Sequence, residues 1–384
     1  MDGQADKAGS VAACGQAAIG VTVAKHVPGC GMCEPPPAYL PVAADAPYEG
    51  AARVVAVRGL DLYQMTREAL RGVGGIGAIV QPGETVFIKP NFGGLGWLKS
   101  NTITGGESTK PEIVAVVAEE CLKAGAATVI IGEGGQARVI DWPNSTTLDG
   151  ATNLVLEAQR LNATYPGRVS LASLMTDSPA WDPLPSPHTG LGTISVSSLL
   201  ASADRVISIA PIKTHRWTHI TGTMKNFVGV TSFDQYGGGM NWRYPLHQAA
   251  GGVSQCFLDI VAALRPDLAI LDGSIGCEGN GPHVMPGVWG TTVNVKDRIG
   301  WWFLLAGTDL AAVDATAARI IGQDPESIPF LSLARDQGLG QIGADKIEFA
   351  GATLADLQME WQPAEHLEGF CEVILPGALL QFGG

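Results

Sequence analysis

Short runs of apolar, often β-branched residues alternate along most of the chain with longer segments in which apolar residues recur every three or four positions. The short runs fit buried strands and the longer segments fit amphipathic helices. Strands are predicted at 53–58, 85–89, 127–132, 193–197, 204–210, 267–271, 301–307 and 346–349, and helices at 62–73, 110–122, 151–161, 254–264, 310–321 and 329–337. This alternation predicts an α/β fold with a mostly parallel central sheet and flanking helices.

Residues 136–190 interrupt the alternation. Apart from the helix at 151–161, this stretch is irregular and contains the Pro-, Asp- and Ser-rich sequence DSPAWDPLPSPH. Long irregular segments inside a compact domain are uncommon and often serve as active-site lids. We therefore expect residues 49–384 to form one α/β domain with an irregular lid insertion at about 136–190.

The first 48 residues form a separate arm with a Pro-rich linker. Its segment Ser10–Ala24 is as apolar and as long as the core of a secretory signal, but no arginine precedes it. Two interpretations stay open, a remnant of a twin-arginine export signal (a periplasmic protein) or an ordinary arm of a cytoplasmic one. Cys30 and Cys33 form a C-x-x-C with Cys14 further back, and the lack of a second ligand pair favours a linker over a zinc site.

The composition of the chain argues against two classes of function, nucleic-acid binding and an integral membrane role for the body of the chain. The formal net charge of −13 argues against nucleic-acid binding, which needs a basic surface. No stretch of about twenty unbroken apolar residues occurs in the body, so no integral membrane segment is expected there. Against this acidic background, clustered lysines are informative.

The densest chemistry lies in residues 211–229, PIKTHRWTHITGTMKNFVG, directly after the strand predicted at 204–210. In an open α/β sheet, ligands bind beyond the carboxyl ends of the strands. Lysines with hydroxyl and amide donors suit a carboxylate or phosphate, because charge-assisted hydrogen bonds are strong. The candidate groups in this stretch are Lys213, Thr214, His215, His219, Thr221, Thr223, Lys225 and Asn226.

Other predicted strands also end in polar residues. Lys89 and Asn91 follow the strand at 85–89, Glu133 follows the next, and Asp272 with Glu278 follows the strand at 267–271. His247 lies in a later segment rich in glycine and aromatic residues, which we expect to close over a substrate.

Two acids belong to the helix predicted at 310–321. Asp309 is expected to cap its first turn. Asp314 lies among alanines, so burial would require a partner, and a lysine from the central stretch is the expected one.

The ordered motifs IKPN (88–91), TKPE (109–112), APIKTH (210–215), TGTMKNFVG (221–229), LDGSIGCEGNGP (271–282) and GTDLAAVDATAARIIG (307–322) resemble the family catalogued as domain of unknown function 362. The resemblance covers about 53–349. It implies no settled reaction, and the residues carried over are Lys89, Asn91, Glu133, Lys213, His215, Lys225, Asn226, Asp272, Glu278 and Asp314. Some members carry iron–sulfur modules, but this chain lacks the four-cysteine pattern, so no iron–sulfur cluster is expected within it.

Three functions follow from these residues. The first is an enzyme for a small anionic molecule, held by Lys89, Lys213 and Lys225, with His215 and a carboxylate (Glu133, Asp272 or Glu278) moving protons. The second is a metal-dependent, redox-capable enzyme with a divalent metal on Glu133, His215, His219 or Asp272, for which the C-x-x-C would exchange electrons with a redox partner protein. The third is a non-enzymatic anion-binding protein.

Overall fold

The computed structural model of the chain describes residues 50–365, except 94, 96–102, 238–242 and 285–288. The predicted N-terminal arm and its three cysteines lie outside the described residues.

A ten-stranded sheet crosses this part of the chain in the order β12-β1-β11-β9-β7-β2-β3-β4, with β10 added to β9 and β8 to β7. The central strands β9, β7, β2, β3 and β4 are mutually parallel, whereas β11 is antiparallel to both of its neighbours. The predicted α/β fold with a mostly parallel sheet is confirmed. The strands are β1 (Ala52–Gly59), β2 (Thr85–Pro90), β3 (Thr128–Glu133), β4 (Val169–Ser173), β7 (Arg205–His215), β8 (His219–Thr221), β9 (Leu268–Glu278), β10 (Thr291–Asn294), β11 (Trp302–Gly307) and β12 (Ile347–Gly351).

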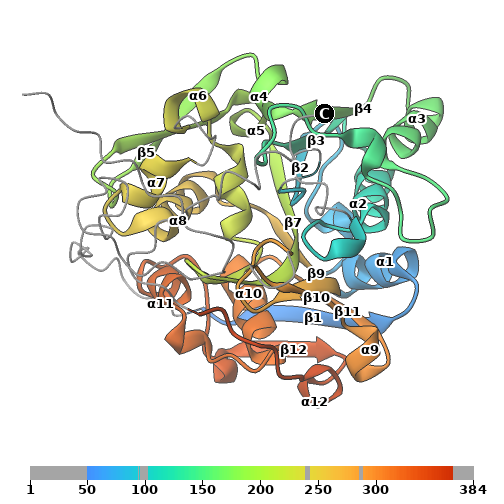
Figure 1. The fold of residues 1–384 in the computed structure, drawn as a ribbon. Helices are drawn as coiled ribbons and strands as arrows, with labels where there is room; N and C mark the ends of the chain where they lie inside the picture. Colours follow the sequence, from blue (N-terminus) through green and yellow to red (C-terminus); the bar gives the residue numbers. More distant parts are fainter. Residues whose placement is uncertain (1–49, 94, 96–102, 238–242, 285–288, 366–384) are drawn as a thin grey trace, which may run out of the picture.

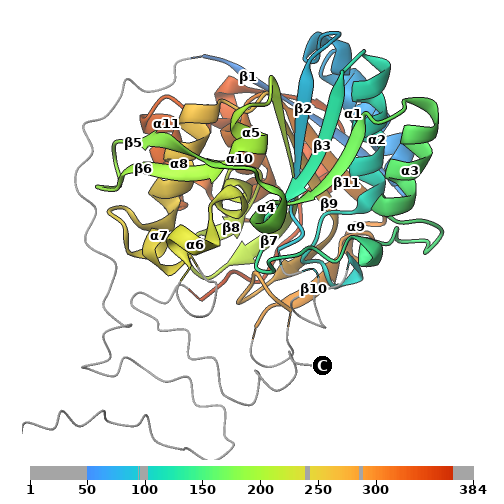
Figure 2. The same cartoon turned by 90° about the horizontal axis from the view of Figure 1, so that it is seen from above.

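Helices cover both faces of the sheet (Figures 1 and 2), α1, α2 and α3 on one face and α8, α10 and α11 on the other. Strand β2 shows how the sequence divides between them: Val86 and Ile88 join one apolar cluster, whereas Phe87 joins the other. Alternate strand residues point to opposite faces, so an unbroken apolar run is buried on both sides. These helices are α1 (Leu62–Gly72), α2 (Pro111–Lys123), α3 (Leu154–Thr164), α8 (Gly252–Leu264), α10 (Leu310–Ile320) and α11 (Pro329–Asp336).

Helix starts follow local sequence signals. Asp309 caps α10 as predicted, because its carboxylate accepts a hydrogen bond from the Ala312 amide at 2.9 Å. Asp61 caps α1 in the same way, and Pro111 occupies the first turn of α2. Proline suits that position because the first helical N–H groups have no partner within the helix.

The structure differs from the sequence prediction at residues 136–190. This stretch is not an irregular lid throughout, since β4 pairs in parallel with β3 and thereby extends the main sheet. Strand β5 (Trp181–Ser186) pairs with β6 (Gly192–Ser197) in a separate two-stranded sheet. Prolines in β5 concealed this strand, but a two-stranded sheet consists of edges, where proline is tolerated.

Two central strands are longer than predicted. Strand β7 continues through Lys213 and Thr214 to His215, so these residues lie in a strand and not in a loop. A register irregularity between Pro211 and Lys213 marks where the apolar part of β7 gives way to its polar end. Strand β9 likewise continues to Glu278, which the sequence had placed in a loop.

Short helices complete the described chain. Within it, no helix has the length and apolarity needed to cross a bilayer. They are the α-helices α4 (Leu174–Asp177), α5 (Ser198–Ala201), α6 (Phe233–Tyr236), α7 (Tyr244–Gln248), α9 (Lys296–Ile299) and α12 (Leu354–Leu357), and the 3-10 helices η1 (Ile76–Ala78), η2 (Ile103–Gly105), η3 (Trp142–Asn144), η4 (Lys225–Val230), η5 (Pro325–Ser327) and η6 (Ala344–Lys346).

Candidate functional site

A buried ion pair joins the ends of β2 and β3. Lys89 Nζ lies 2.8 Å from Glu133 Oε1, and both side chains are 1% exposed. Lys89 Nζ also donates to the carbonyl of Pro90 and to Asn226 Oδ1, so its three protons are all used. Burial lowers the pKa of Lys89, an effect that the adjacent Glu133 carboxylate opposes.

The Glu133 carboxylate is also fully engaged. Its Oε1 accepts from the amide of Gly134 and its Oε2 accepts from the amide of Phe92, each at 2.7 Å. The pair therefore fixes the loops that leave β2 and β3. Close packing accompanies it, since a Cβ on Gly229 would lie 2.9 Å from Glu133 Oε1.

A chain of side-chain amides extends this pair to β7. Asn226 Oδ1 accepts from Asn91 Nδ2 at 3.1 Å, and Asn91 Oδ1 accepts from Lys213 Nζ at 2.8 Å. Lys213 Nζ donates in addition to the carbonyl of Glu107 at 2.7 Å. The structure thus brings together five of the predicted residues, from three strands and η4, by direct hydrogen bonds: Lys89, Asn91, Glu133, Lys213 and Asn226.

A second buried ion pair lies at the N-terminal end of α2, between Lys110 and Asp272. Lys110 Nζ lies 3.3 Å from Asp272 Oδ2, and neither side chain is exposed. Asp272 also accepts from the Lys110 amide and from Ser274, so both of its oxygens have partners. Lys110 was missed as a functional partner from the sequence, where it signalled only a helix start.

A second group of residues, here called the basic cluster, lies beside the polar end of β7 and consists of Lys213, His215, Lys225, Arg243 and His247. His215 is buried, and its Nδ1 accepts a hydrogen bond from the Trp217 amide at 3.1 Å. The Trp217 ring lies 5.6 Å from the His215 ring and 5.3 Å from the His247 ring, measured between centroids. Trp217 therefore stands between the two imidazoles.

Burial and neighbouring positive charges lower the pKa values of the two histidines of the basic cluster. Burial, reinforced by Lys225, lowers the pKa of His215 well below its ordinary value, and the same causes lower the pKa of His247 to about 3. Both rings are accordingly neutral at neutral pH. Because Nδ1 of His215 accepts from Trp217, its proton resides on Nε2, which is left as a donor.

Lys225 differs from the other lysines of the site. It begins η4 and is partly exposed, and within the described residues its ammonium has no hydrogen bond or ion pair. Burial, with the charges of Lys213 and Arg243, lowers the pKa of Lys225 to about 7. The pKa of Lys213 falls to about 8, chiefly through burial.

Arg243 is buried and makes no ion pair among the described residues. Its guanidinium donates to the carbonyls of Gly134, Gly135 and Thr231 and lies 4.4 Å from the centre of the Phe233 ring. Burial lowers the pKa of Arg243 to about 9. It fastens the loop after β3 to the segment after η4, and its charge adds to the positive potential at Lys225.

Asp314 fixes the turn before Lys225. Its hydrogen-bond partners are the backbone and hydroxyl groups of that turn, and not the lysine that the sequence suggested. Asp314 Oδ1 accepts from the amide and hydroxyl of Thr223 at 2.7 and 2.8 Å, and Oδ2 accepts from the Met224 amide at 3.0 Å. Burial raises the pKa of Asp314 to about 6. Binding a buried carboxylate with backbone amides costs less free energy than binding it with a lysine, because no second charge has to be removed from water.

Thr221, in β8, is one of the candidate hydroxyl groups that the sequence indicates in residues 211–229. It pairs directly with Lys213 across the two strands, so both side chains lie on one face. The Thr221 hydroxyl is buried and has no hydrogen-bond partner in the described part of the chain. Leaving a buried hydroxyl without a hydrogen-bond partner costs about 1–3 kcal/mol of free energy.

Two further predicted residues bond outside these two groups. Thr214 donates to the Gly279 carbonyl at 2.6 Å, and Glu278 pairs with Arg298 at 2.5 Å. His219 opens β8 with a left-handed backbone, φ 62°, opposite His215. Among the described residues, no three His, Cys, Asp or Glu side chains are grouped so that they could hold a metal ion.

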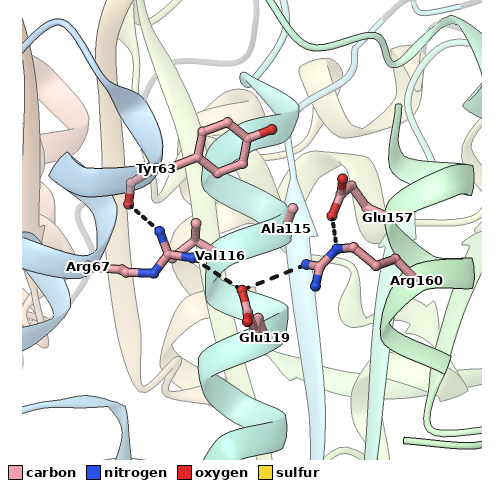
Figure 3. Close-up of a pocket in the computed structure, with 7 residues that line it drawn as sticks. All are labelled: Tyr63, Arg67, Ala115, Val116, Glu119, Glu157 and Arg160. Carbon is pink, nitrogen blue, oxygen red and sulfur yellow. Dashed lines mark hydrogen bonds and ion pairs between the residues drawn. The ribbon is translucent and has the colours of Figure 1, made fainter. Parts of the chain in front are cut away.

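A cavity of about 420 Å³ lies away from both groups of residues, between α1, α2 and α3 (Figure 3). Its two arginines are already neutralised, since Arg67 pairs with Glu119 at 3.2 Å and Arg160 with Glu157 at 2.8 Å. Neither of the arginines that line this cavity is left without a carboxylate partner, so the cavity does not favour an anion.

Comparison with known proteins gives a family match and a curated relative. A family model described as "Domain of unknown function (DUF362)" matches residues 86–319. The thylakoid-associated protein sll1697 of Synechocystis sp. (strain ATCC 27184 / PCC 6803 / Kazusa) is 29% identical over 293 residues, which cover 74% of this chain and 77% of that protein.

Two solved structures are similar at 11% identity. A protein from Thermotoga maritima matches with a TM-score of 0.38, covering 66% of this chain and 57% of that one. The lactate racemase apoprotein from Thermoanaerobacterium thermosaccharolyticum matches with a TM-score of 0.34, covering 68% of this chain and 58% of that one. In both cases the match spans less than two thirds of the solved chain.

Proposed function

Because this chain belongs to the family of domain of unknown function 362, whose description states no reaction, we propose a function from the site: the basic cluster binds a small carboxylate or phosphate and acts on it as an enzyme. The observation that carries the proposal is an imbalance of charge. At the same sheet edge Lys89 and Lys110 each have a buried carboxylate partner, whereas within the described residues Lys213, Lys225 and Arg243 make no ion pair.

Uncompensated buried charge is costly, so a protein normally pairs it or neutralises it. The chain has a net charge of −13 and therefore an excess of acids, yet no acid among the residues that the structure describes forms an ion pair with these three cations. A bound anion would supply the missing charge. The Thr221 hydroxyl and the Nε2–H of His215 would complete its hydrogen bonds, since both are donors suited to carboxylate or phosphate oxygens.

The same residues support chemistry. A general acid or base works best with a pKa near the working pH, and the pKa of Lys225 is about 7. Lys225 is therefore the proposed proton carrier, with His215 as the neighbouring donor. Glu133 and Asp272 would act by positioning, because each is engaged by a lysine and by amide or hydroxyl donors. Glu278 stays a prediction that this mechanism does not use.

Calorimetric titration with oxalate and inorganic phosphate tests the proposal. Charge-assisted hydrogen bonds contribute about 1.5–3 kcal/mol, so Lys225→Met should weaken binding by about tenfold or more. Thr221→Val should weaken it several-fold. Lys123→Met removes the same charge from an exposed lysine that pairs with Glu119 and Glu120, and should change little. Equal losses in Lys123→Met and Lys225→Met, or no binding to the wild-type protein, would overturn the proposal.

A further inference from the structure

We infer that Lys225 is a nucleophile toward carbonyl carbon, and that the anion is a 2-oxo acid whose carbonyl forms a Schiff base with this lysine. The inference rests on the proposed function, since it takes the basic cluster as the site of the anion. It adds the class of substrate and the bond that forms, and it replaces the role of Lys225 as proton carrier by that of nucleophile.

The geometry distinguishes Lys225 from the other lysines of the sheet edge. Lys89, Lys110 and Lys213 each donate at least two hydrogen bonds to protein acceptors. Lys225 donates none within the described residues, is partly exposed, and begins η4 just after the turn that Asp314 holds. A nucleophilic amine needs a free lone pair, a fixed backbone and access for the carbonyl, and this residue meets all three conditions.

The surroundings favour the neutral amine. Lysines that form Schiff bases are activated by burial or by a neighbouring cation, which disfavours the ammonium form. Lys225 has both, since burial and the charges of Lys213 and Arg243 act on it together. The carboxylate of a 2-oxo acid is adjacent to its carbonyl, so Lys213 and Thr221, which face the same side of β7 and β8, would hold that carboxylate beside the reacting carbon.

The step balances without a further reactant. The neutral Nζ attacks the carbonyl carbon, a C–N bond forms, and the π electrons of the carbonyl move to its oxygen. The nitrogen then gives up its two protons, the oxygen takes two, the C–O bond breaks and one water leaves. The product is an imine between Lys225 and the 2-oxo acid, with no change of oxidation state.

Reductive trapping tests this step. Glyoxylate or pyruvate is incubated with the full chain and sodium cyanoborohydride at pH 7, and the modified lysine is located by peptide mass spectrometry. We expect a single adduct at Lys225, formed at least about tenfold faster than any adduct at Lys123, because far more of Lys225 is neutral at that pH. Oxalate, which offers carboxylates but no reactive carbonyl, should slow the labelling.

Two variants, together with a comparison of oxalate binding and adduct formation, separate the Schiff base from the proposed anion binding. Lys225→Arg keeps the positive charge and should bind oxalate but form no adduct, and its thermal unfolding should match the wild type because the Lys225 side chain has no hydrogen bonds to lose in the described structure. Lys123→Met should label at Lys225 as the wild type does. Oxalate binding without any adduct at Lys225 would overturn the Schiff base alone. Absence of both would overturn the proposed function as well.

Discussion

Replacing Glu133 with glutamine leaves the Lys89 ammonium buried without its counter-ion. The pair is 2.8 Å apart and 1% exposed on both sides, so water cannot easily replace the lost carboxylate. Breaking a buried ion pair by removing one partner costs about 3–5 kcal/mol. The NH2 group of the glutamine would also face another donor, either the Lys89 ammonium or the backbone N–H of Phe92 or Gly134. A buried donor without an acceptor adds about 1–3 kcal/mol to the loss of stability.

Urea denaturation followed by circular dichroism would measure this loss. We expect Glu133→Gln to lower the free energy of unfolding by about 4 kcal/mol, a large part of the 5–15 kcal/mol typical of a folded protein. Lys89→Met in the same protein removes the stranded charge, so the double variant should lose less than the two single variants together, with a coupling energy of about 2 kcal/mol or more.

A matched control separates burial from charge. Glu120→Gln breaks an ion pair with Lys123 at the surface, where such pairs contribute about 0–1 kcal/mol. It should therefore change the free energy of unfolding very little. If Glu133→Gln costs no more than Glu120→Gln, or if the two variants at the buried pair add within about 0.5 kcal/mol, the reasoning about the buried pair is refuted.

Three further predictions concern the turn before Lys225, the start of α10 and the titration of the site. Gly222→Ala would place a Cβ 2.4 Å from the Asp314 carboxylate and should destabilise the protein by about 2 kcal/mol or more, measured by urea unfolding, whereas Gly77→Ala, which has open space around it and likewise no positive φ, should change the stability little. Asp309→Ala removes the cap of α10 and an acceptor for the Gln341 amide, and should cost about 1–2 kcal/mol in the same assay, with no loss indicating that the cap is dispensable. Oxalate binding requires protonated Lys225, so above pH of about 7 the affinity should fall by up to tenfold per pH unit in calorimetric titrations, and a pH-independent affinity would contradict this.

The sequence predicted the architecture well because apolar runs and helical periodicity report burial directly. It also placed lysines and amides correctly at the carboxyl ends of the parallel strands, because polar residues directly after buried strands lie at that edge of the sheet. Lys89, Asn91 and Glu133 meet there with Lys213 and Asn226 through hydrogen bonds of 2.8–3.1 Å.

The sequence could not assign partners, because these depend on contacts between distant segments. Asp272 and Lys110 are 162 positions apart, and nothing local distinguishes this pair from a catalytic carboxylate and a helix start. Asp314 was expected to meet a lysine, but the turn at Thr223 offers amides and a hydroxyl instead. The charge imbalance around Lys225 appears only when every other lysine of the edge has been matched with its acceptor.

The titration of the Lys225 amine tests the central claim most directly. Carbon-13 nuclear magnetic resonance of lysine labelled at Cε, assigned with Lys225→Arg, would follow this group between pH 5 and 11 with and without oxalate. An uncompensated basic cluster predicts a midpoint of about 7 that rises when oxalate binds, because the anion stabilises the ammonium form. A midpoint near the ordinary lysine value of about 10.4, unmoved by oxalate, would contradict it.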